Sequence, residues 1–272
     1  MQLKDVNKLE IIAKQIRRDI IEMIHAAGSG HPGGSLSAAD ILAVLYFHVM
    51  KHEPKDPQSA GRDRFYLSKG HACPVLYAAL GEAGYFDKAE FLKLRKLGSM
   101  LQGHPHRLKT PGVEASSGSL GQGLSLSVGT ALGLKMDAKP NRVYCLMGDG
   151  ELQEGQVWEA AMAAGHFQLD NLCAIVDYNN LQIDGQVESV MGLAPLAQKW
   201  RSFRWHVVDV NGHDVVSLAR AFEEAGRTRG LPSLLLARTV KGKGVSFMED
   251  KAEWHGKAPN KAEYEQALQE LM

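Results

Sequence analysis

The chain of 272 residues has little cysteine, no excess charge of either sign and no long apolar run. Its three cysteines, Cys73, Cys145 and Cys173, are odd in number and lack C-x-x-C spacing, which argues against a disulfide framework and favours a reducing compartment. Lys plus Arg and Asp plus Glu each total 31, so nothing resembles the basic footprint of a nucleic-acid-binding protein. No stretch approaches the roughly 20 apolar residues of a transmembrane helix, and the charged start of the chain lacks a signal-peptide apolar region. We therefore expect a cytoplasmic protein that partners neither a nucleic acid nor a membrane.

Helical and strand-like patterns alternate along the chain, and its 44% hydrophobic content is enough for a substantial core. Apolar residues at three- and four-residue spacing predict helices, and short apolar runs predict buried strands. We expect helices at 9–24, 37–50, 74–84, 88–97, 120–135, 156–165, 215–227 and 263–271, and strands at 142–147, 172–178, 206–210 and 233–240. This alternation predicts an α/β fold with a mostly parallel sheet flanked by helices on both faces, in a single domain spanning 1–272.

Local signals mark the ends of the first helices and one long loop. Gly28 and Gly30 predict where the first helix stops. Ser37, three residues before Asp40, is expected to be the N-cap of the second helix. The region 98–123 is rich in Gly, His, Pro and Ser and has little periodicity. Long loops of this kind are usually functional or disordered.

The most informative stretch is an apolar run that leads directly into Gly148-Asp149-Gly150. The next apolar run ends in Asn179, at a spacing that fits one crossover helix and one return strand. Ligands of parallel α/β sheets bind beyond the carboxyl ends of the strands, where Asp149 and Asn179 are expected to emerge side by side. A carboxylate, an amide oxygen and one backbone carbonyl are hard ligands that suit Mg²⁺. The flanking glycines are expected to let the backbone turn sharply and approach a ligand closely.

Taken alone, a Gly-Asp-Gly sequence is more often an ordinary tight turn between a strand and a helix, and Asn179-Asn180 an ordinary loop. Two such groups at this spacing, each at the end of a buried strand, favour the metal site instead.

These motifs and several others along the chain resemble those of the transketolase family. Gly148-Asp149-Gly150 followed by Asn179-Asn180 resembles the signature for thiamine diphosphate. The other matching segments are 28–34 (GSGHPGG), 63–72 (DRFYLSKGHA), 103–105 (GHP), 118–123 (GSLGQG) and 254–256 (WHG). They run in the expected order over nearly the whole chain. The resemblance is to the N-terminal, diphosphate-binding part of a transketolase, so it implies the N-terminal subunit of a split enzyme.

The resemblance also implies a set of site residues, position by position. The expected Mg²⁺ ligands are Asp149, Asn179 and the Leu181 carbonyl, in a site that Ca²⁺ or Mn²⁺ can also occupy. The expected contacts to thiamine diphosphate are His71, Gly118, Ser119, Leu120, Gly150, Asn179, Ile183, Lys241 and His255. The expected catalytic residues are His31, His104, His255 and Glu154, of which the first two resemble histidines that face the thiazolium ring and the sugar. Ser119 stands where many family members have proline.

These histidines and glutamates also have plainer interpretations. A loop histidine is more often a solvated surface residue, and His104 with His106 also matches a zinc pair, although no cysteine lies near them. An imidazole near its usual pKa of about 6.5 can donate, accept or carry charge, which suits a sugar phosphate. Acids that follow the metal loop are favoured by the helix dipole, and this interpretation fits Glu151 well. By resemblance, Glu154 and Glu159 lie at a subunit interface.

The activity implied is that of transketolase: transfer of a two-carbon ketol unit from a ketose phosphate to an aldose phosphate, as in the pentose phosphate pathway. The resemblance implies a C-terminal transketolase subunit with the pyrimidine-binding domain as partner, in an α2β2 heterotetramer that is active only when assembled. Zero net charge agrees with association. The alternatives are another thiamine-diphosphate enzyme, such as a dihydroxyacetone synthase or a deoxyxylulose phosphate synthase, and a non-catalytic cofactor-binding partner subunit.

Overall fold

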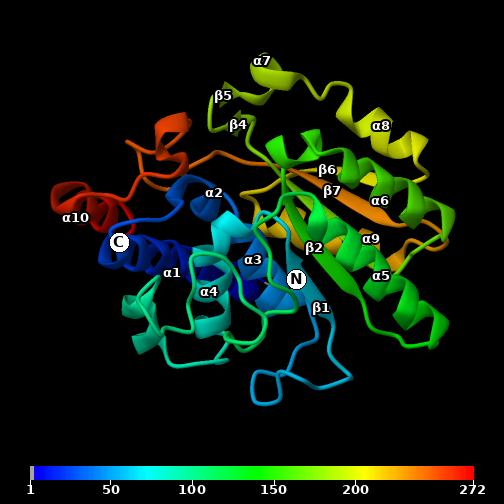
Figure 1. Cartoon of the computed structure of the whole chain (residues 1–272), viewed down its shortest axis with the longest axis horizontal. Coiled ribbons are helices and arrows are strands. Elements are labelled where there is room, and N and C mark those ends of the chain that lie inside the picture. The colour runs from blue at the N-terminus through cyan, green and yellow to red at the C-terminus, as the bar shows by residue number, and fades with distance from the viewer. Residues whose placement is uncertain (1–2) are drawn as a thin grey trace.

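A five-stranded parallel sheet in the order β1-β2-β3-β7-β6 forms the centre of the molecule (Figure 1). The computed structural model describes the backbone of residues 3–272 and the side chains from residue 5 onward. The strands of the sheet are β1 (Arg64–Leu67), β2 (Val143–Gly148), β3 (Leu172–Tyr178), β7 (Ser233–Arg238) and β6 (His206–Asn211). A separate antiparallel hairpin, β4 (Leu181–Gln182) with β5 (Gly185–Gln186), follows β3. The predicted α/β fold with a mostly parallel sheet is confirmed.

Helices cover both faces of this sheet (Figure 1). The α-helices are α1 (Leu3–Ala27), α2 (Pro32–Leu36), α3 (Ala39–Val44), α4 (Cys73–Glu82), α5 (Gln122–Met136), α6 (Gly155–His166), α7 (Val187–Met191), α8 (Leu196–Ser202), α9 (Val215–Arg227) and α10 (Lys261–Glu270). Short 3₁₀-helices lie at Gly70–Ala72, Lys88–Lys93, Gly150–Gln153 and Ala252–His255, and a π-helical turn at Leu45–Val49. Among the helices of the described residues, none is both long enough and apolar enough to cross a bilayer.

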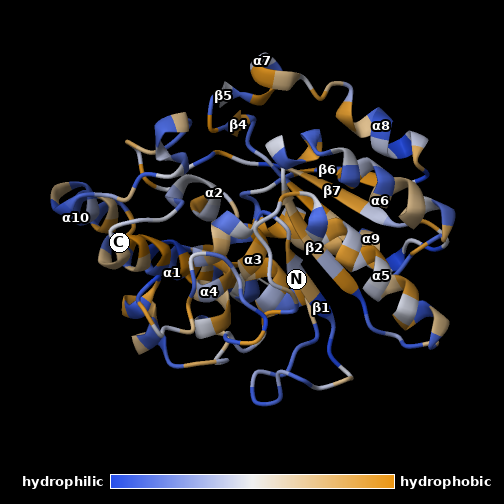
Figure 2. Cartoon of the chain, viewed as in Figure 1, coloured by the Kyte–Doolittle hydropathy of each residue, from blue (hydrophilic) through white to orange (hydrophobic). Residues whose placement is uncertain are grey.

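The central strands β2, β3 and β7 are largely apolar because each face of the sheet packs against its own layer of helices (Figure 2). On β2, Tyr144 and Leu146 contribute to a core shared with α1, α3, α4 and α9. The alternate residues Val143, Cys145 and Met147 contribute to a second core shared with α5, α6 and α8. Successive side chains of a strand point to opposite faces, so continuous apolar runs are what a doubly covered sheet requires.

Several helices begin or end at residues whose chemistry explains the boundary. The first helix ends at Ala27, and Gly28 follows it with φ +65°, a left-handed conformation that favours glycine. The predicted helix 263–271 starts at Lys261 because Asn260 and Glu263 form a capping box. The Asp214 carboxylate accepts hydrogen bonds from the first backbone amides of α9.

The predicted helix 37–50 is wrong in its start and its continuity. The helical segment begins earlier, at Pro32, and breaks between Leu36 and Ala39. Ser37 is therefore not an N-cap, and its hydroxyl donates instead to the Asp177 carboxylate at 2.5 Å. The long-range hydrogen bond outweighs the local capping pattern, because a buried carboxylate is costly and each donor to it lowers that cost.

One further predicted helix is corrected, and several short elements were not expected. The predicted helix 88–97 is only a 3₁₀-helix that ends at Lys93, and Arg95 then takes a left-handed φ of +62°. The hairpin β4–β5 and the helices α7 and α8 were not expected. Their segments are short, and short elements carry too few periods to be recognised from sequence. The predicted long loop is present, and α5 begins after it, at Gln122.

Candidate functional site

A cleft of about 530 Å³ opens at the carboxyl ends of the central strands. Its walls come from the segments after β1, β2, β3 and β7, together with α2 and the 3₁₀-helix near His255. The predicted site residues that line it are His31, His71, Gly118, Leu120, Asp149, Gly150, Glu154, Asn179, Leu181, Ile183, Lys241 and His255. Residues separated by more than 200 positions in the chain are thus brought into one cavity.

Asp149 and Asn179 leave neighbouring strands, and Gly148 pairs with Asp177 in the parallel register. One Asp149 carboxylate oxygen accepts the Gly150 amide at 2.8 Å, and the other accepts the Asn180 amide. The Asn179 side-chain oxygen accepts the Leu181 amide at 3.1 Å. The two predicted metal-binding side chains therefore lie together, on a backbone that holds their oxygens in place.

The Asp149 carboxylate is 2% exposed and has no ion-pair partner among the described residues. Burial, and then the negative charge of Asp177, raise the pKa of Asp149 to about 6. A buried carboxylate without a counter-ion is costly, and a cation beside it removes that cost. The Asn179 amide oxygen and the Leu181 carbonyl add hard oxygen donors, so the residues present fit a divalent cation such as Mg²⁺.

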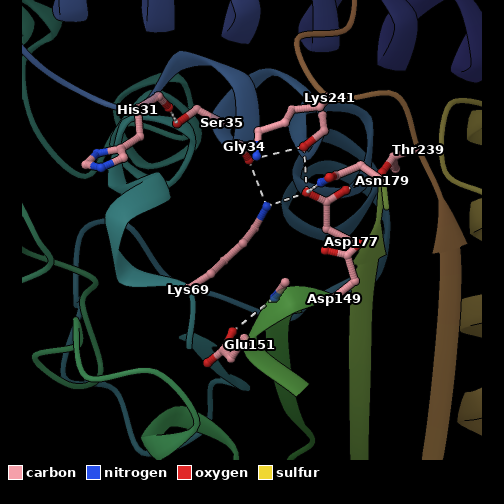
Figure 3. Close-up of polar contacts among 12 residues, drawn as sticks. His31, Gly34, Ser35, Lys69, Asp149, Glu151, Asp177, Asn179, Thr239 and Lys241 are labelled. Atoms are coloured by element: carbon pink, nitrogen blue, oxygen red, sulfur yellow. Dashed lines mark hydrogen bonds and ion pairs between the residues drawn. The ribbon is translucent and has the colours of Figure 1, made fainter. Parts of the chain in front are cut away.

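A buried ion pair at the base of the cleft was not foreseen. The Lys69 ammonium lies 2.5 Å from the Asp177 carboxylate and 2.7 Å from the Gly34 carbonyl (Figure 3). Asp177 also accepts the hydroxyls of Ser37 and Thr239 and, at 3.2 Å, the Asn179 side-chain amide. The last bond turns the Asn179 amide nitrogen inward and leaves its oxygen toward Leu181 and the cleft. A sequence signal existed, because Asp177 is a charged residue inside an otherwise apolar run.

Glu151 lies in the first turn of a short helix, as expected, and also has a role that was not foreseen. It is a buried carboxylate that accepts the Ser68 hydroxyl and the backbone amides of Gly121 and Gly148, the last at 3.0 Å (Figure 3). Burial raises its pKa, and these hydrogen bonds oppose the rise. Glu151 therefore joins the metal loop to the segments after β1 and before α5. Without Glu151, these three donors would be buried without a hydrogen-bond partner, and satisfying them matters more than the interaction with the helix dipole.

Three histidines form a contiguous group on one wall. The ring centroids of His31, His71 and His255 lie 5.1 to 5.5 Å apart. Burial lowers the pKa of His31 to about 4, of His71 to about 2 and of His255 to about 3, and neighbouring cations, Lys69 and Lys241 among them, lower these pKa values further. The expectation of imidazoles near their usual pKa is therefore wrong for these three. They are neutral at pH 7 and act as hydrogen-bond donors and acceptors.

Lys241 connects this histidine group to the metal-binding residues. Its ammonium donates to the Leu181 carbonyl at 2.9 Å and lies 2.9 Å from the His255 Nδ1. Burial lowers the pKa of Lys241 to about 8. A Cβ on Gly33 would lie 3.0 Å from the Lys241 side chain and 2.9 Å from the Trp254 carbonyl, which explains the glycine at this position.

The glycines of the metal loop do not depend on a left-handed backbone conformation. Neither Gly148 nor Gly150 has a positive φ, and the chain turns at Asp149 between them. A Cβ on Gly150 would lie 2.8 Å from the Gln182 side-chain oxygen, so a larger residue here would require the end of that side chain to shift. The left-handed residue of this region is Asn180, with φ +59°, and asparagine tolerates that conformation.

The remaining predicted residues lie at the rim. His104 packs on Gly118, where a Cβ would lie 3.1 Å from its ring, and neither His104 nor Ser119 lines the cavity. Glu154 is exposed at the edge of the cleft. Ile183, in the turn of the hairpin, is 70% exposed. The rim thus presents a carboxylate and an apolar side chain to whatever covers the cleft.

Residues 9–271 match the family model described as transketolase, thiamine diphosphate binding domain. The chain belongs to this family. This agrees with the motif resemblance and with the position of the cleft at the strand ends.

The chain is similar over its length to proteins named as transketolase subunits. It is 46% identical over 259 residues to the 6-deoxy-6-sulfo-D-fructose transketolase subunit SqwG of Clostridium sp. (strain MSTE9), covering 95% of this chain and 94% of that protein. It is 42% identical over 266 residues to an apulose-4-phosphate transketolase subunit from Phocaeicola vulgatus, covering 98% of this chain and 94% of that protein.

Longer transketolases match over less than half of their own length. Human transketolase is 44% identical over 271 residues, which cover 98% of this chain and 43% of the human protein. The crystal structure of transketolase from Campylobacter jejuni superimposes with a TM-score of 0.92 at 35% identity, covering 100% of this chain and 43% of that one. The fold and the family are therefore established independently of the motifs.

Proposed function

We propose that this chain is the diphosphate-binding subunit of a two-chain transketolase, in which 1–272 is a single domain. With its partner it transfers a two-carbon ketol unit from a ketose phosphate to an aldose phosphate. The observation that carries this proposal is the buried Asp149 carboxylate, which forms no ion pair within the described residues and leaves its strand next to the one that leads to Asn179 and Leu181. The chain that holds it belongs to a thiamine-diphosphate-binding family.

Each wall of the cleft has its own task in this proposal. Asp149, Asn179 and the Leu181 carbonyl would hold Mg²⁺, which would supply positive charge for the diphosphate. His71, Gly150, Lys241 and His255 would hold the diphosphate, for which the Lys241 ammonium provides a buried positive charge. Gly118, Ser119, Leu120 and Ile183 would hold the rest of the cofactor. When bound, thiamine diphosphate supplies the nucleophilic carbon that takes up the two-carbon unit.

The histidines position the sugar as neutral groups. His31 has a buried Nδ1 without a hydrogen-bond partner in the described residues, and a substrate hydroxyl can satisfy it. His104 and His255 bind neighbouring hydroxyls in the same manner. Because these rings are uncharged at pH 7, they donate and accept protons without repelling the metal.

The partner is a C-terminal transketolase subunit that carries the pyrimidine-binding domain. Relatives that match this chain over 94% of their own length are named as subunits, which supports an assembly of separate chains. We propose an α2β2 heterotetramer in the cytoplasm, with the exposed Glu154 and Ile183 at the contact that closes the cleft. Those relatives are named for different sugars. We therefore propose the class of the donor ketose, a sugar that carries a terminal phosphate or sulfonate group, and not one particular sugar.

The direct test is an assay of ketol transfer with the assembled enzyme. The chain is purified alone and together with the product of a neighbouring gene that resembles the missing domains. Transfer from xylulose 5-phosphate to ribose 5-phosphate is then measured with thiamine diphosphate and Mg²⁺. We expect turnover only in the assembly, and turnover by the isolated chain would contradict the split enzyme.

The metal assignment is tested in the same assembly with Asp149→Ala. Loss of one charged Mg²⁺ ligand is expected to weaken Mg²⁺-dependent cofactor binding by about 100-fold or more, measured by calorimetry. Asp137→Ala, at an exposed carboxylate after α5, is the matched control and should bind as the parent does. Equal affinity for Asp149→Ala and the control would refute the metal site.

A further inference from the structure

The turn between β6 and α9 lies directly against the chain as it leaves β7. The Gly212 amide donates to the Arg238 carbonyl at 2.8 Å. A Cβ on Gly212 would lie 2.4 Å from the Thr239 side chain, so only glycine permits this approach. The close approach brings the next residue, His213, to the segment that leads to Lys241.

His213 connects this segment to the layer of helices behind the sheet. Its Nδ1 lies 2.7 Å from the Asp40 carboxylate of α3, and its Nε2 accepts the Val240 amide at 2.8 Å. A ring nitrogen that accepts an N–H carries no proton, so the proton is on Nδ1 and the imidazole is neutral. Arg17 of α1 holds the other side of Asp40 with two hydrogen bonds. Arg17, Asp40 and His213 are all largely buried.

The residue after Val240 is Lys241, whose ammonium lies in the cleft. That ammonium reaches the Leu181 carbonyl and the His255 ring, each at 2.9 Å. The loop after β7 has no regular structure through Lys243, so Val240 obtains its direction from outside a ladder of strand hydrogen bonds. The Thr239 amide is held by the Tyr178 carbonyl and the Gly242 amide by the Gly33 carbonyl, and His213 holds the Val240 amide between them.

We propose that His213 is a positioning residue for Lys241. Asp40 selects the Nδ1–H tautomer, Nε2 then holds the Val240 amide, and the direction of the backbone at Val240 sets where the Lys241 ammonium stands in the cleft. The role of Lys241 toward the diphosphate rests on the function proposed above. The positioning itself concerns this chain alone.

The first experiment needs no cofactor. Reductive methylation of the full chain, followed by mass spectrometry, gives the rate at which each lysine is labelled. Lys241 and Lys69 are each 2% exposed, so both are protected in the parent. Loss of one hydrogen bond in His213→Ala is expected to speed labelling of Lys241 by roughly five- to tenfold, with Lys69 unchanged. General loosening of the fold would speed both alike and would overturn the proposal.

Two further variants control this measurement. His213→Gln keeps an acceptor that can reach the Val240 amide, and we expect it to restore most of the protection of Lys241. His206→Gln is the control. His206 lies on β6, pairs with Glu224 of α9 and is away from Val240, so this variant should leave the labelling of both lysines as in the parent. Equal labelling of Lys241 in His213→Ala and His206→Gln would refute the positioning role.

The second experiment is a double-mutant cycle in the assembled enzyme, with the affinity for thiamine diphosphate in Mg²⁺ measured by calorimetry. His213→Ala is expected to weaken binding roughly fivefold in the parent but less than twofold in the Lys241→Met background, since the histidine acts through that lysine. Additive effects would contradict this route. A parent assembly that binds no cofactor would instead overturn the proposed function, and the labelling result would still decide the positioning of Lys241.

Discussion

Individual residues in the cleft carry charges that their surroundings balance only in part. The Asp177 carboxylate is matched by the Lys69 ammonium, whereas Asp149 accepts only backbone amides. The same burial that raises the pKa of Asp149 lowers the pKa of His71, because burial disfavours the charged form of each group. A cation beside Asp149 and an anion beside the histidines would both relieve this cost, as the diphosphate site proposed above requires.

The buried histidines predict that the chain loses stability in mild acid. Unfolded His71 takes up a proton near pH 6.5, but its folded pKa is lowered to about 2, so its contribution is complete above pH 6.5 and falls as the pH drops. Between pH 6.5 and pH 5 this costs about 2 kcal/mol for His71 alone, at 1.36 kcal/mol per pH unit. Urea unfolding of the isolated chain at pH 7 and pH 5 measures the loss.

His71→Gln should reduce the difference between the two pH values by about that amount. The exposed His166 provides the matched control, since burial cannot act on it, and His166→Gln should keep the parent's difference. An unchanged pH dependence in His71→Gln would mean that this ring is not held neutral by burial.

At the scale of elements, the helices on one face approach so closely that a methyl group has no room. A Cβ on Gly165 of α6 would lie 1.9 Å from the Phe203 carbonyl, just after α8. On α5, by contrast, a Cβ on Gly129 would meet nothing within 4 Å. Two helical glycines therefore exist for different reasons, one for packing and one with no steric need within this chain.

The contrast predicts opposite effects of the same substitution. Gly165→Ala should lower the free energy of unfolding by roughly 1–3 kcal/mol, because backbone must move to admit the methyl group. Gly129→Ala should raise it by up to about 1 kcal/mol through helix propensity. Chemical denaturation of both variants decides the matter, and a stabilising Gly165→Ala would show that α8 does not pack against α6 in this manner.

For the whole molecule, the site lies where separate layers meet. Lys69 follows β1, Asp177 ends β3, and Gly34 and Thr239 belong to α2 and the segment after β7, so one buried ion pair joins four parts of the fold (Figure 3). Removal of one member leaves an uncompensated buried charge, which costs more than removal of both. Site geometry and global stability are therefore coupled through this pair.

Lys69→Met is expected to lower the free energy of unfolding by about 3–5 kcal/mol, and addition of Asp177→Asn should recover a large part of it. The exposed pair of Arg238 and Asp209, with side chains 61% and 48% exposed, is the control and should contribute about 1 kcal/mol or less. Urea denaturation of the single and double variants gives the coupling. A coupling no larger than that of the surface pair would contradict a structural role for Lys69.

Much of the site could be predicted because its residues stand at the ends of strongly apolar runs. Asp149 and Asn179 follow β2 and β3 directly, so their proximity required only that the two strands be parallel neighbours. Lys69 and Glu151 could not be assigned in the same way. Their partners come from distant segments, and sequence spacing says nothing about which buried polar groups meet.

The sequence by itself determined the α/β alternation, the main strands and the order of the motifs, since these depend on hydrophobic periodicity and residue type over a few positions. Only the tertiary structure decided the strand order, the pairing of Lys69 with Asp177 and the neutral state of His31, His71 and His255. It also showed that Ser37 is not an N-cap, because its hydroxyl donates to the buried Asp177 carboxylate far along the chain. Burial and long-range contact decide charge state and partner choice, and both arise only when the layers assemble.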